Sequence, residues 1–72
     1  MPLVQIKGIQ GYLSPEQKQE FIKRVTDAVA SVEGEKVRPV IWVIVEDVNS
    51  GEWGVGGEPI TTQRFKQIAS GR

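Results

Sequence analysis

The residue with the clearest chemical potential is Pro2, which directly follows Met1 and opens a strand-like run that extends to Lys7. Methionine aminopeptidase removes an initiator Met when the next residue is as small as proline, and this would leave Pro2 with a free secondary amine. An α-amino group titrates near ~8, and burial or nearby cations lower the pKa of such an amine. A neutral amine at pH 7 serves as a general base. Because proline is also common at position two without any chemical role, the rest of the chain decides between these interpretations.

Three further side chains are candidates to line a site. Trp42 lies in an apolar stretch and Trp53 lies beside a glycine-rich turn, and each indole suits either packing or the wall of a pocket. Arg38 is either a solvated loop cation or a partner for a carboxylate, which it would bind through two parallel hydrogen bonds. The sequence has no Cys and no His, which excludes Cys–His nucleophiles, His-dependent serine hydrolases and thiolate zinc sites. We therefore expect neither a metal nor a cofactor.

The elements that would position these side chains begin with a strand over residues 3–9, which are rich in β-branched residues. A helix follows, in which Ser14 is the expected N-cap, Pro15 suits the first helical position and Gln17 completes a capping box. Apolar residues then recur at helical spacing as far as Gly34, the expected end of the helix. These inward-facing residues are Phe21, Ile22, Val25, Ala28, Val29 and Val32.

The second strand is expected at residues 40–45, where an unbroken apolar run is typical of a strand buried on both faces. Strand, helix and strand form a β-α-β unit with a parallel pair of strands. One helix covers only one face of such a pair, so the other face requires a partner subunit. Glu46 and Asp47 adjoin at the end of this strand, and their side chains point to opposite faces, which argues against a paired-carboxylate site.

After the second strand the chain becomes rich in turn residues. Residues 49–51 form a turn, and the glycine-rich run 54–57 predicts a tight hairpin. This run lacks the length and the Lys-Ser/Thr ending of a phosphate-binding loop. Either Thr61 or Thr62 then caps a short final helix. Its inward residues are Phe65 and Ile68. The predicted fold class is α+β, and residues 1–72 form a single domain.

Size and charge limit the possible functions further. A chain of 72 residues buries only about 60% of its unfolded surface, so its core is marginal. Without disulfides or metal ligands, association with further copies is the remaining source of stability. Nine basic and nine acidic residues cancel, so nothing favours nucleic acid or an anionic membrane as a partner. The longest apolar run is too short to span a bilayer, and the start lacks the pattern of a signal peptide. We expect a cytoplasmic homo-oligomer.

Taken together, residues 2–57 resemble the 4-oxalocrotonate tautomerase family. The shared features are Pro2 at the start of a strand, the helix start over residues 14–18, an apolar second strand and the hairpin Trp53-Gly54-Val55-Gly56-Gly57. The resemblance implies a β-α-β unit with a C-terminal β-hairpin, assembled as a hexamer that is a trimer of dimers. It also implies that Pro2 is the catalytic base, which moves a proton between a dienol oxygen and a carbon of a 2-oxo acid.

The substrate-binding positions of the family differ in this chain. The family has an Arg directly after the glycine that closes the first strand, and here Tyr12 follows Gly11. A second Arg of the family corresponds to Trp42 in this chain. The aromatic residue that lines the family's pocket matches Trp53. The predicted substrate-binding residues are Tyr12, Trp42, Trp53 and Arg38. Because an unpaired carboxylate is costly to bury, such a site suits a monoacid or an aromatic enol better than a dicarboxylate.

Two classes of function remain open. The first is an isomerase: a keto–enol tautomerase that acts on a small 2-oxo acid or its enol. The second is a non-catalytic oligomer of the same fold, which binds a ligand or serves as a structural subunit, and the two missing arginines favour it. Val55 stands where dehalogenase-like relatives of the family carry an acidic residue, which argues against hydration of halogenated acrylates.

Overall fold

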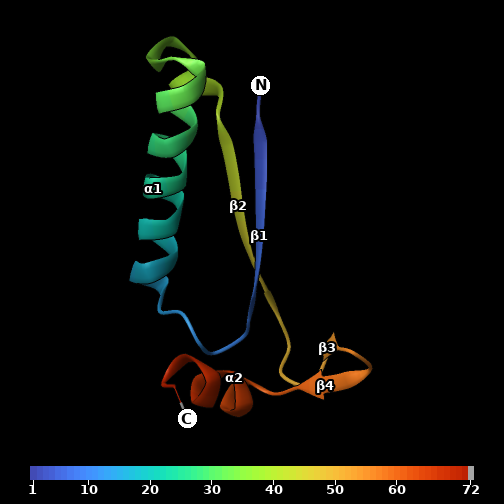
Figure 1. Cartoon of the computed structure of the whole chain (residues 1–72). Helices are drawn as coiled ribbons and strands as arrows, with labels where there is room; N and C mark the ends of the chain where they lie inside the picture. The colour runs from blue at the N-terminus through green and yellow to red at the C-terminus, as the bar shows by residue number, and fades with distance from the viewer. Residues whose placement is uncertain (72) are drawn as a thin grey trace.

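A long helix and two strands form the body of the chain, and a hairpin with a short helix lies at one end (Figure 1). The computed structural model describes residues 1–71. In chain order the elements are β1 (Leu3–Ile9), α1 (Pro15–Glu33), the 3-10 helix η1 (Glu35–Val40), β2 (Trp42–Val48), β3 (Trp53–Val55), β4 (Glu58–Ile60) and α2 (Thr62–Ala69). The predicted β-α-β unit with a C-terminal hairpin is confirmed.

Helix α1 begins with the predicted capping box. Ser14 Oγ accepts a hydrogen bond from the Gln17 N–H at 3.1 Å, and Gln17 Oε1 accepts one from the Ser14 N–H at 2.9 Å. The pair satisfies donors at the helix start that have no partner within the helix. At the other end Gly34 follows with a φ of 111°, a conformation that glycine adopts without steric cost. Local chemistry therefore determines both ends of α1.

Strands β1 and β2 pair in parallel, with Leu3 opposite Trp42 and Ile9 opposite Val48. Lys18 of α1 bonds to Asp47 at 2.6 Å, and because strand side chains alternate between faces, the face that carries Asp47 packs against α1. That face carries Val4, Ile6, Gly8, Val43, Val45 and Asp47. On the opposite face Leu3 and Trp42 are 54% and 56% exposed, so this face lies largely open.

Strand β2 begins and ends later than the sequence predicts. The strand expected at residues 40–45 runs from Trp42 to Val48, because residues 35–40 form η1. Pro39 lies inside this 3-10 helix, where its fixed φ near −65° fits a helical turn. The Ile41 N–H then donates to the Arg38 carbonyl at 3.2 Å and ends the turn. Val40 therefore belongs to a helical turn and not to the strand.

The predicted hairpin and final helix are both present. Strands β3 and β4 pair antiparallel, and Gly56 and Gly57 connect them with φ values of 60° and 88°. A two-residue turn with positive φ at both positions matches the right-handed twist of the strands. Thr61 caps α2, because its side chain accepts a hydrogen bond from the Arg64 N–H at 3.0 Å. Of the two threonines expected for this role, the first is the cap.

The core of a single chain is small. Within residues 1–71 the buried apolar side chains are Ile9 and Ala30, at 6% and 1% exposure. The radius of gyration is 14.8 Å, whereas about 11 Å is typical of a compact domain of this length. The chain exposes 5406 Å², against roughly 4,450 Å² for a compact monomer of its 8.0 kDa mass. A single chain is therefore more extended, and exposes more surface, than a compact monomer of the same length.

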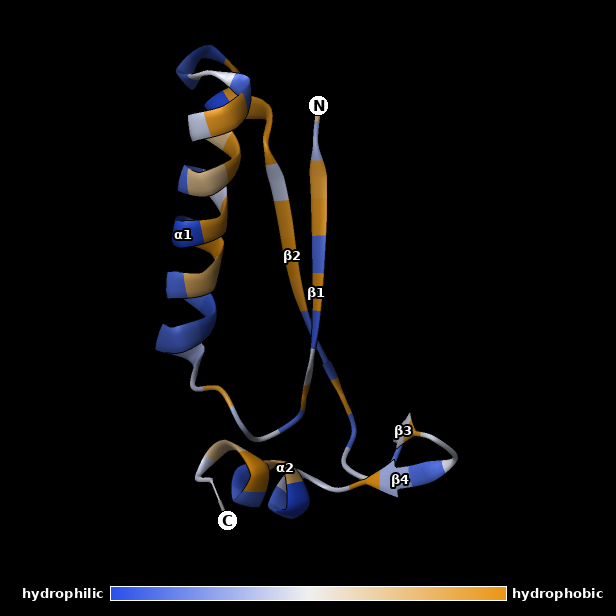
Figure 2. Cartoon of the chain, viewed as in Figure 1, coloured by the Kyte–Doolittle hydropathy of each residue, from blue (hydrophilic) through white to orange (hydrophobic). Residues whose placement is uncertain are grey.

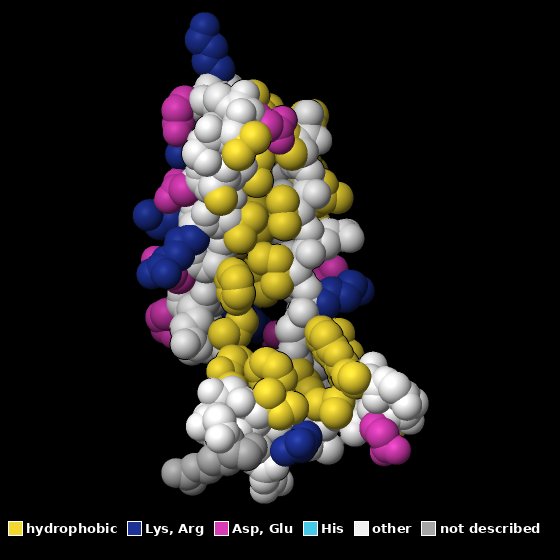
Figure 3. Space-filling view, in the orientation of Figure 1, with side chains coloured by type: hydrophobic (Ala, Val, Ile, Leu, Met, Phe, Trp, Pro, Cys, Tyr) yellow, Lys and Arg dark blue, Asp and Glu magenta, His cyan; other side chains and the backbone are white. Residues whose placement is uncertain are grey.

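Much of the exposed surface is apolar. Figure 2 shows hydrophobic residues alternating with hydrophilic ones in β1, and a mostly hydrophobic β2 with a hydrophilic stretch near its end. Figure 3 shows hydrophobic side chains between α1 and the strands and again over the end that carries the hairpin and α2. Contiguous apolar surface of this kind marks sites of contact with other molecules. As for the bilayer, none of the helices in residues 1–71 combines the length and apolar character that a membrane span requires.

Candidate functional site

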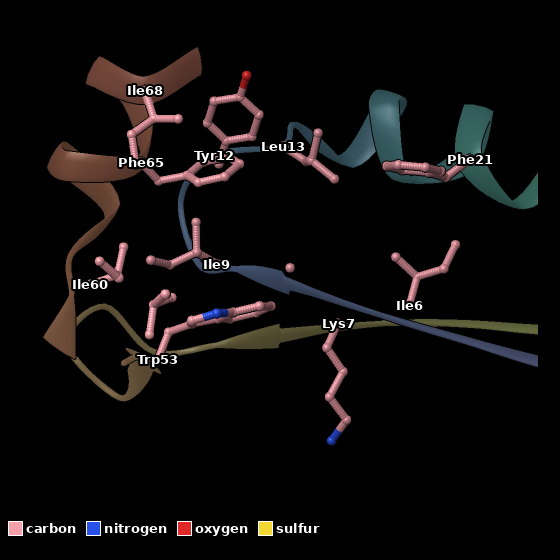
Figure 4. A pocket seen from close by; sticks show the side chains of 12 residues that line it. Ile6, Lys7, Ile9, Tyr12, Leu13, Phe21, Trp53, Ile60, Phe65 and Ile68 are labelled. Atoms are coloured by element: carbon pink, nitrogen blue, oxygen red, sulfur yellow. The ribbon is translucent and has the colours of Figure 1, made fainter. Parts of the chain in front are cut away.

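A hollow of about 560 Å³ lies at the end of the chain where β1 stops. Its walls come from β1, the loop after it, the start of α1, the hairpin and α2 (Figure 4). The lining side chains are almost all apolar: Ile6, Ile9, Tyr12, Leu13, Phe21, Trp53, Val55, Ile60, Phe65 and Ile68. Lys7 also borders the hollow, but Figure 4 shows its side chain pointing away. The volume falls within the ~300–1,000 Å³ typical of small-molecule sites.

Tyr12 reaches this hollow through the turn that follows β1. Gly11 has a φ of 86°, which turns the chain after the strand, and the Tyr12 N–H donates to the Ile9 carbonyl at 3.4 Å. The Tyr12 ring packs edge-to-face on Phe65, with 4.7 Å between the ring centroids and 85° between the planes. Such a pair stabilises by about 0.5–1.5 kcal/mol beyond area burial, so Phe65 fixes the orientation of Tyr12.

Trp53 forms the opposite wall of the hollow. It opens β3, is half-buried and pairs with Ile60 of β4. Figure 4 shows its indole on the far side of Ile9 from the Tyr12 ring. The predicted residues Tyr12 and Trp53 therefore share one cavity, and their O–H and N–H groups are its side-chain donors besides Lys7. Sequence reasoning identified Phe65 and Ile68 as inward-facing but did not predict that they would line this cavity.

Pro2 and Trp42 lie together at the other end of the strand pair. Pro2 is half-buried, and its carbonyl accepts a hydrogen bond from the Trp42 N–H at 3.0 Å. This bond fixes Pro2 against β2 at the edge of the open sheet face. Met1 precedes it and is 83% exposed. Removal of Met1 would therefore free an amine whose position is already set by the strand ladder.

Arg38 is engaged by two carboxylates of its own chain. Its Nε and Nη2 donate to Glu35 at 2.8 and 3.0 Å, and its Nη1 donates to Asp27 at 2.7 Å. These hydrogen bonds hold the pKa values of both carboxyl groups below their ordinary ranges, and the two carboxylates raise the pKa of Arg38. Lys23 also pairs with Asp27 at 3.5 Å. Three of the five N–H donors of this guanidinium are therefore engaged within the chain, and its charge is already shared between two acids.

The predicted site residues thus form two separate groups within one chain. Pro2, Trp42 and the η1 residue Arg38 lie at the start of the strand pair, and Tyr12 and Trp53 lie beyond its end. The seven residues of β1 that separate them span about 20 Å. No small substrate bridges that distance. Within the described part of the chain there is also no cluster of three or more acidic side chains that could hold a metal ion.

Comparison with known proteins gives consistent matches along most of the chain. A family model described as tautomerase enzyme matches residues 2–63. The chain is 33% identical over 64 residues to the probable tautomerase K2 of Dickeya dadantii, which covers 89% of this chain and 94% of that protein. The similarity therefore extends over nearly the full length of both this chain and the Dickeya dadantii protein.

Solved structures give the same result. The crystal structure of DmpI from Helicobacter pylori superimposes with a TM-score of 0.71 at 36% identity, over 82% of this chain and 95% of that one. A 4-oxalocrotonate tautomerase isozyme from Methylibium petroleiphilum superimposes with a TM-score of 0.72 at 30% identity, over 89% and 97%. The strand–helix–strand unit and the hairpin are thus similar in sequence and in three-dimensional structure to those proteins.

Proposed function

Because the chain belongs to the tautomerase family, we propose that it is a keto–enol tautomerase whose general base is the amine of Pro2. In the proposed reaction the substrate is the enol form of a small 2-oxo acid. The Pro2 nitrogen takes the proton from the enol oxygen and delivers a proton to carbon, so no atom is gained or lost. The observation that carries the proposal is the Trp42 N–H bond at 3.0 Å to the Pro2 carbonyl, which fixes the base in position.

The surroundings of Pro2 suit an amine that is neutral at working pH. Pro2 is half-buried, and its neighbours across and along the ladder, Trp42 and Leu3, are apolar. Loss of solvent disfavours an ammonium ion, so a second copy that covers this end of the strand pair would favour the neutral amine. A base with a pKa near the working pH transfers protons efficiently in both directions.

We further propose that each site is shared between copies of the chain, within a hexamer. Pro2 and Trp42 lie about 20 Å from Tyr12 and Trp53 along the strand, so one copy must supply the base and another the aromatic hollow. Three observations support this: the open sheet face with Leu3 and Trp42 more than half exposed, the surface excess of the single chain, and the apolar hollow beyond the end of β1. Closed symmetric assembly then buries all three.

The proposed substrate is a small monoacid whose remaining part is apolar or aromatic, for example phenylenolpyruvate. The hollow offers Tyr12, Trp53 and Phe65 as walls for a ring, whereas a second carboxylate would be buried without a partner, at a cost of several kcal/mol. For the one carboxylate of a 2-oxo acid we propose Arg38, in exchange with Glu35. Glu35 is the more exposed of its two acids, at 71% against 46% for Asp27.

The test compares two forms of the same protein. In one form Met1 is removed, as intact mass shows, and in the other an amino-terminal extension keeps Pro2 acylated and without basicity. We expect tautomerisation of phenylenolpyruvate by the processed form and a loss of about 10²–10⁴-fold in kcat in the extended form. A small electrophile should also modify Pro2 near neutral pH faster than it modifies Lys7. Equal activity of both forms, or modification that follows the lysines, would remove Pro2 as the base.

A further inference from the structure

Most of helix α2 lies beyond the segment that the family model matches. The tautomerase model matches residues 2–63, whereas α2 extends from Thr62 to Ala69. Phe65 and Ile68, which contribute to the hollow, therefore both lie beyond the matched segment.

The start of α2 is attached to two loops at once. The Thr62 N–H donates to Ser50 Oγ at 3.0 Å, in the turn before the hairpin, and the Thr62 hydroxyl donates to the Gln10 carbonyl at 2.5 Å, in the loop after β1. The methyl group of Thr62 also lies against Gly11. The bond to Gln10 joins residues 52 positions apart, and together these contacts place α2 across the end of the strand pair (Figure 1).

From this position α2 directs apolar side chains into the hollow. Figure 4 shows Phe65 beside Tyr12, with Ile68 next to the pair and Trp53 on the far side of Ile9. Phe65 holds Tyr12 edge-to-face at 4.7 Å. The side of the hollow built by α2 thus presents no charged group, since the lining from this helix is Phe65 and Ile68 alone.

We propose that α2 is the specificity wall of the site: through Phe65 and the Tyr12 ring that it orients, it selects substrates whose distal part is an uncharged aromatic or branched apolar group. This inference rests on the proposed tautomerase function for its kinetic form. An aromatic ring gains from edge-to-face contact with these walls, whereas a distal carboxylate would lose its hydration without meeting a cation there. Phe65 does not touch the reacting atoms, so it acts through substrate binding and through Tyr12.

Two pairs of variants test the wall. Phe65→Ala should raise KM for phenylenolpyruvate about 3- to 10-fold with kcat nearly unchanged, because it removes binding that is equal in ground and transition states. A dicarboxylated dienol should be affected far less. Thr62→Val should change KM in the same direction, because it removes the hydroxyl that bonds to Gln10, while Thr62→Ser should restore the parent value. Lys66→Ala, on the same helix but outside the hollow, is the matched control.

A binding measurement separates this inference from the proposed function. Tryptophan fluorescence can follow the unreactive acid 3-phenylpropanoate as it binds near Trp53, in the parent and in Phe65→Ala. Weaker binding to the variant supports the wall even if the parent turns over neither substrate, a result that would reject the tautomerase proposal alone. If the parent is active and Phe65→Ala changes neither the KM ratio of the two substrates nor the affinity for 3-phenylpropanoate, the wall is rejected and the tautomerase proposal stands.

Discussion

Trp42 is the residue whose replacement best tests the charge of the proposed site. Its N–H bonds to the Pro2 carbonyl, and its side chain is 56% exposed on the open sheet face. We predict that Trp42→Arg raises kcat/KM for a dicarboxylated dienol at least about 10-fold relative to phenylenolpyruvate, because a charge-assisted hydrogen bond then meets the second carboxylate. Steady-state rates on both substrates measure this ratio. An unchanged ratio would place Trp42 outside the pocket.

Arg38 gives a prediction on acid stability. Its hydrogen bonds lower the pKa values of Asp27 and Glu35 from their ordinary 3.8 and 4.5. A carboxyl group with a lowered folded-state pKa contributes stability above its ordinary pKa and loses that contribution as pH falls through the lowered value. The thermal unfolding midpoint of the parent should therefore decrease once the pH is lowered under about 4.5, because these groups then take up protons. In Arg38→Gln, without the cation, the same fall should be smaller.

The same variant tests the proposed role of Arg38 in binding substrate. If Arg38 binds the substrate carboxylate in exchange with Glu35, Arg38→Gln should raise KM about 10-fold. Lys23→Gln is the control, since Lys23 also pairs with Asp27 but does not contact Glu35 in the structure. If Arg38→Gln shifts the thermal unfolding midpoint but leaves KM unchanged, Arg38 stabilises the fold and does not bind the substrate. A parallel rise in KM for both variants would point to Asp27 and not to the guanidinium.

At the scale of the elements, local signals predicted most of the fold. The bounds of β1 and the capping box of α1 agree with the sequence because both depend on a few neighbouring residues. The predicted start of β2 was wrong, because an apolar run does not distinguish a strand from a turn of 3-10 helix around Pro39. The residues of the site were proposed from type and motif. Their separation into two groups follows from the length of the extended strand β1, whose bounds the sequence did predict, but the family resemblance assigned these residues to one site without measuring that length.

The hairpin gives a prediction on one glycine. Gly57 has a φ of 88°, a conformation that costs a residue with a Cβ roughly 1–2 kcal/mol. We predict that Gly57→Ala lowers the free energy of unfolding by about that amount and weakens binding of an aromatic acid, because β3 carries Trp53. Gly54→Ala is the control: its φ is not positive, and an added methyl would lie in ordinary contact with the Glu58 carbonyl at 4.0 Å. Denaturant unfolding measures the free energy of unfolding of both variants. Equal losses in the two would contradict the assignment of the cost to the positive φ of Gly57.

At the scale of the whole molecule, a single copy exposes more surface than a compact monomer of its mass. The excess is about 950 Å² over a compact monomer of this mass, which is comparable to the ~800 Å² that each partner buries in a stable protein–protein interface. Exposed apolar side chains lie at two different places, with Leu3 and Trp42 on the open sheet face and the lining of the hollow at the end that carries the hairpin and α2 (Figure 3). Two separate apolar places support the proposed closed hexamer, in which more than one kind of contact covers each copy.

The last prediction tests whether two copies build one site. Acylated Pro2, or Pro2→Leu in which Met1 stays attached, should inactivate one end of a copy, and Trp53→Ala should weaken the other end, about 20 Å away along β1. When the inactive protein and the weakened one are unfolded together in equal amounts and refolded, about a quarter of the shared sites should combine a native base with a native wall, because subunits assort at random in a symmetric oligomer. Activity should then return well above the sum of the two separate proteins. A site contained in one chain would regain nothing, since every copy in the mixture carries one defect.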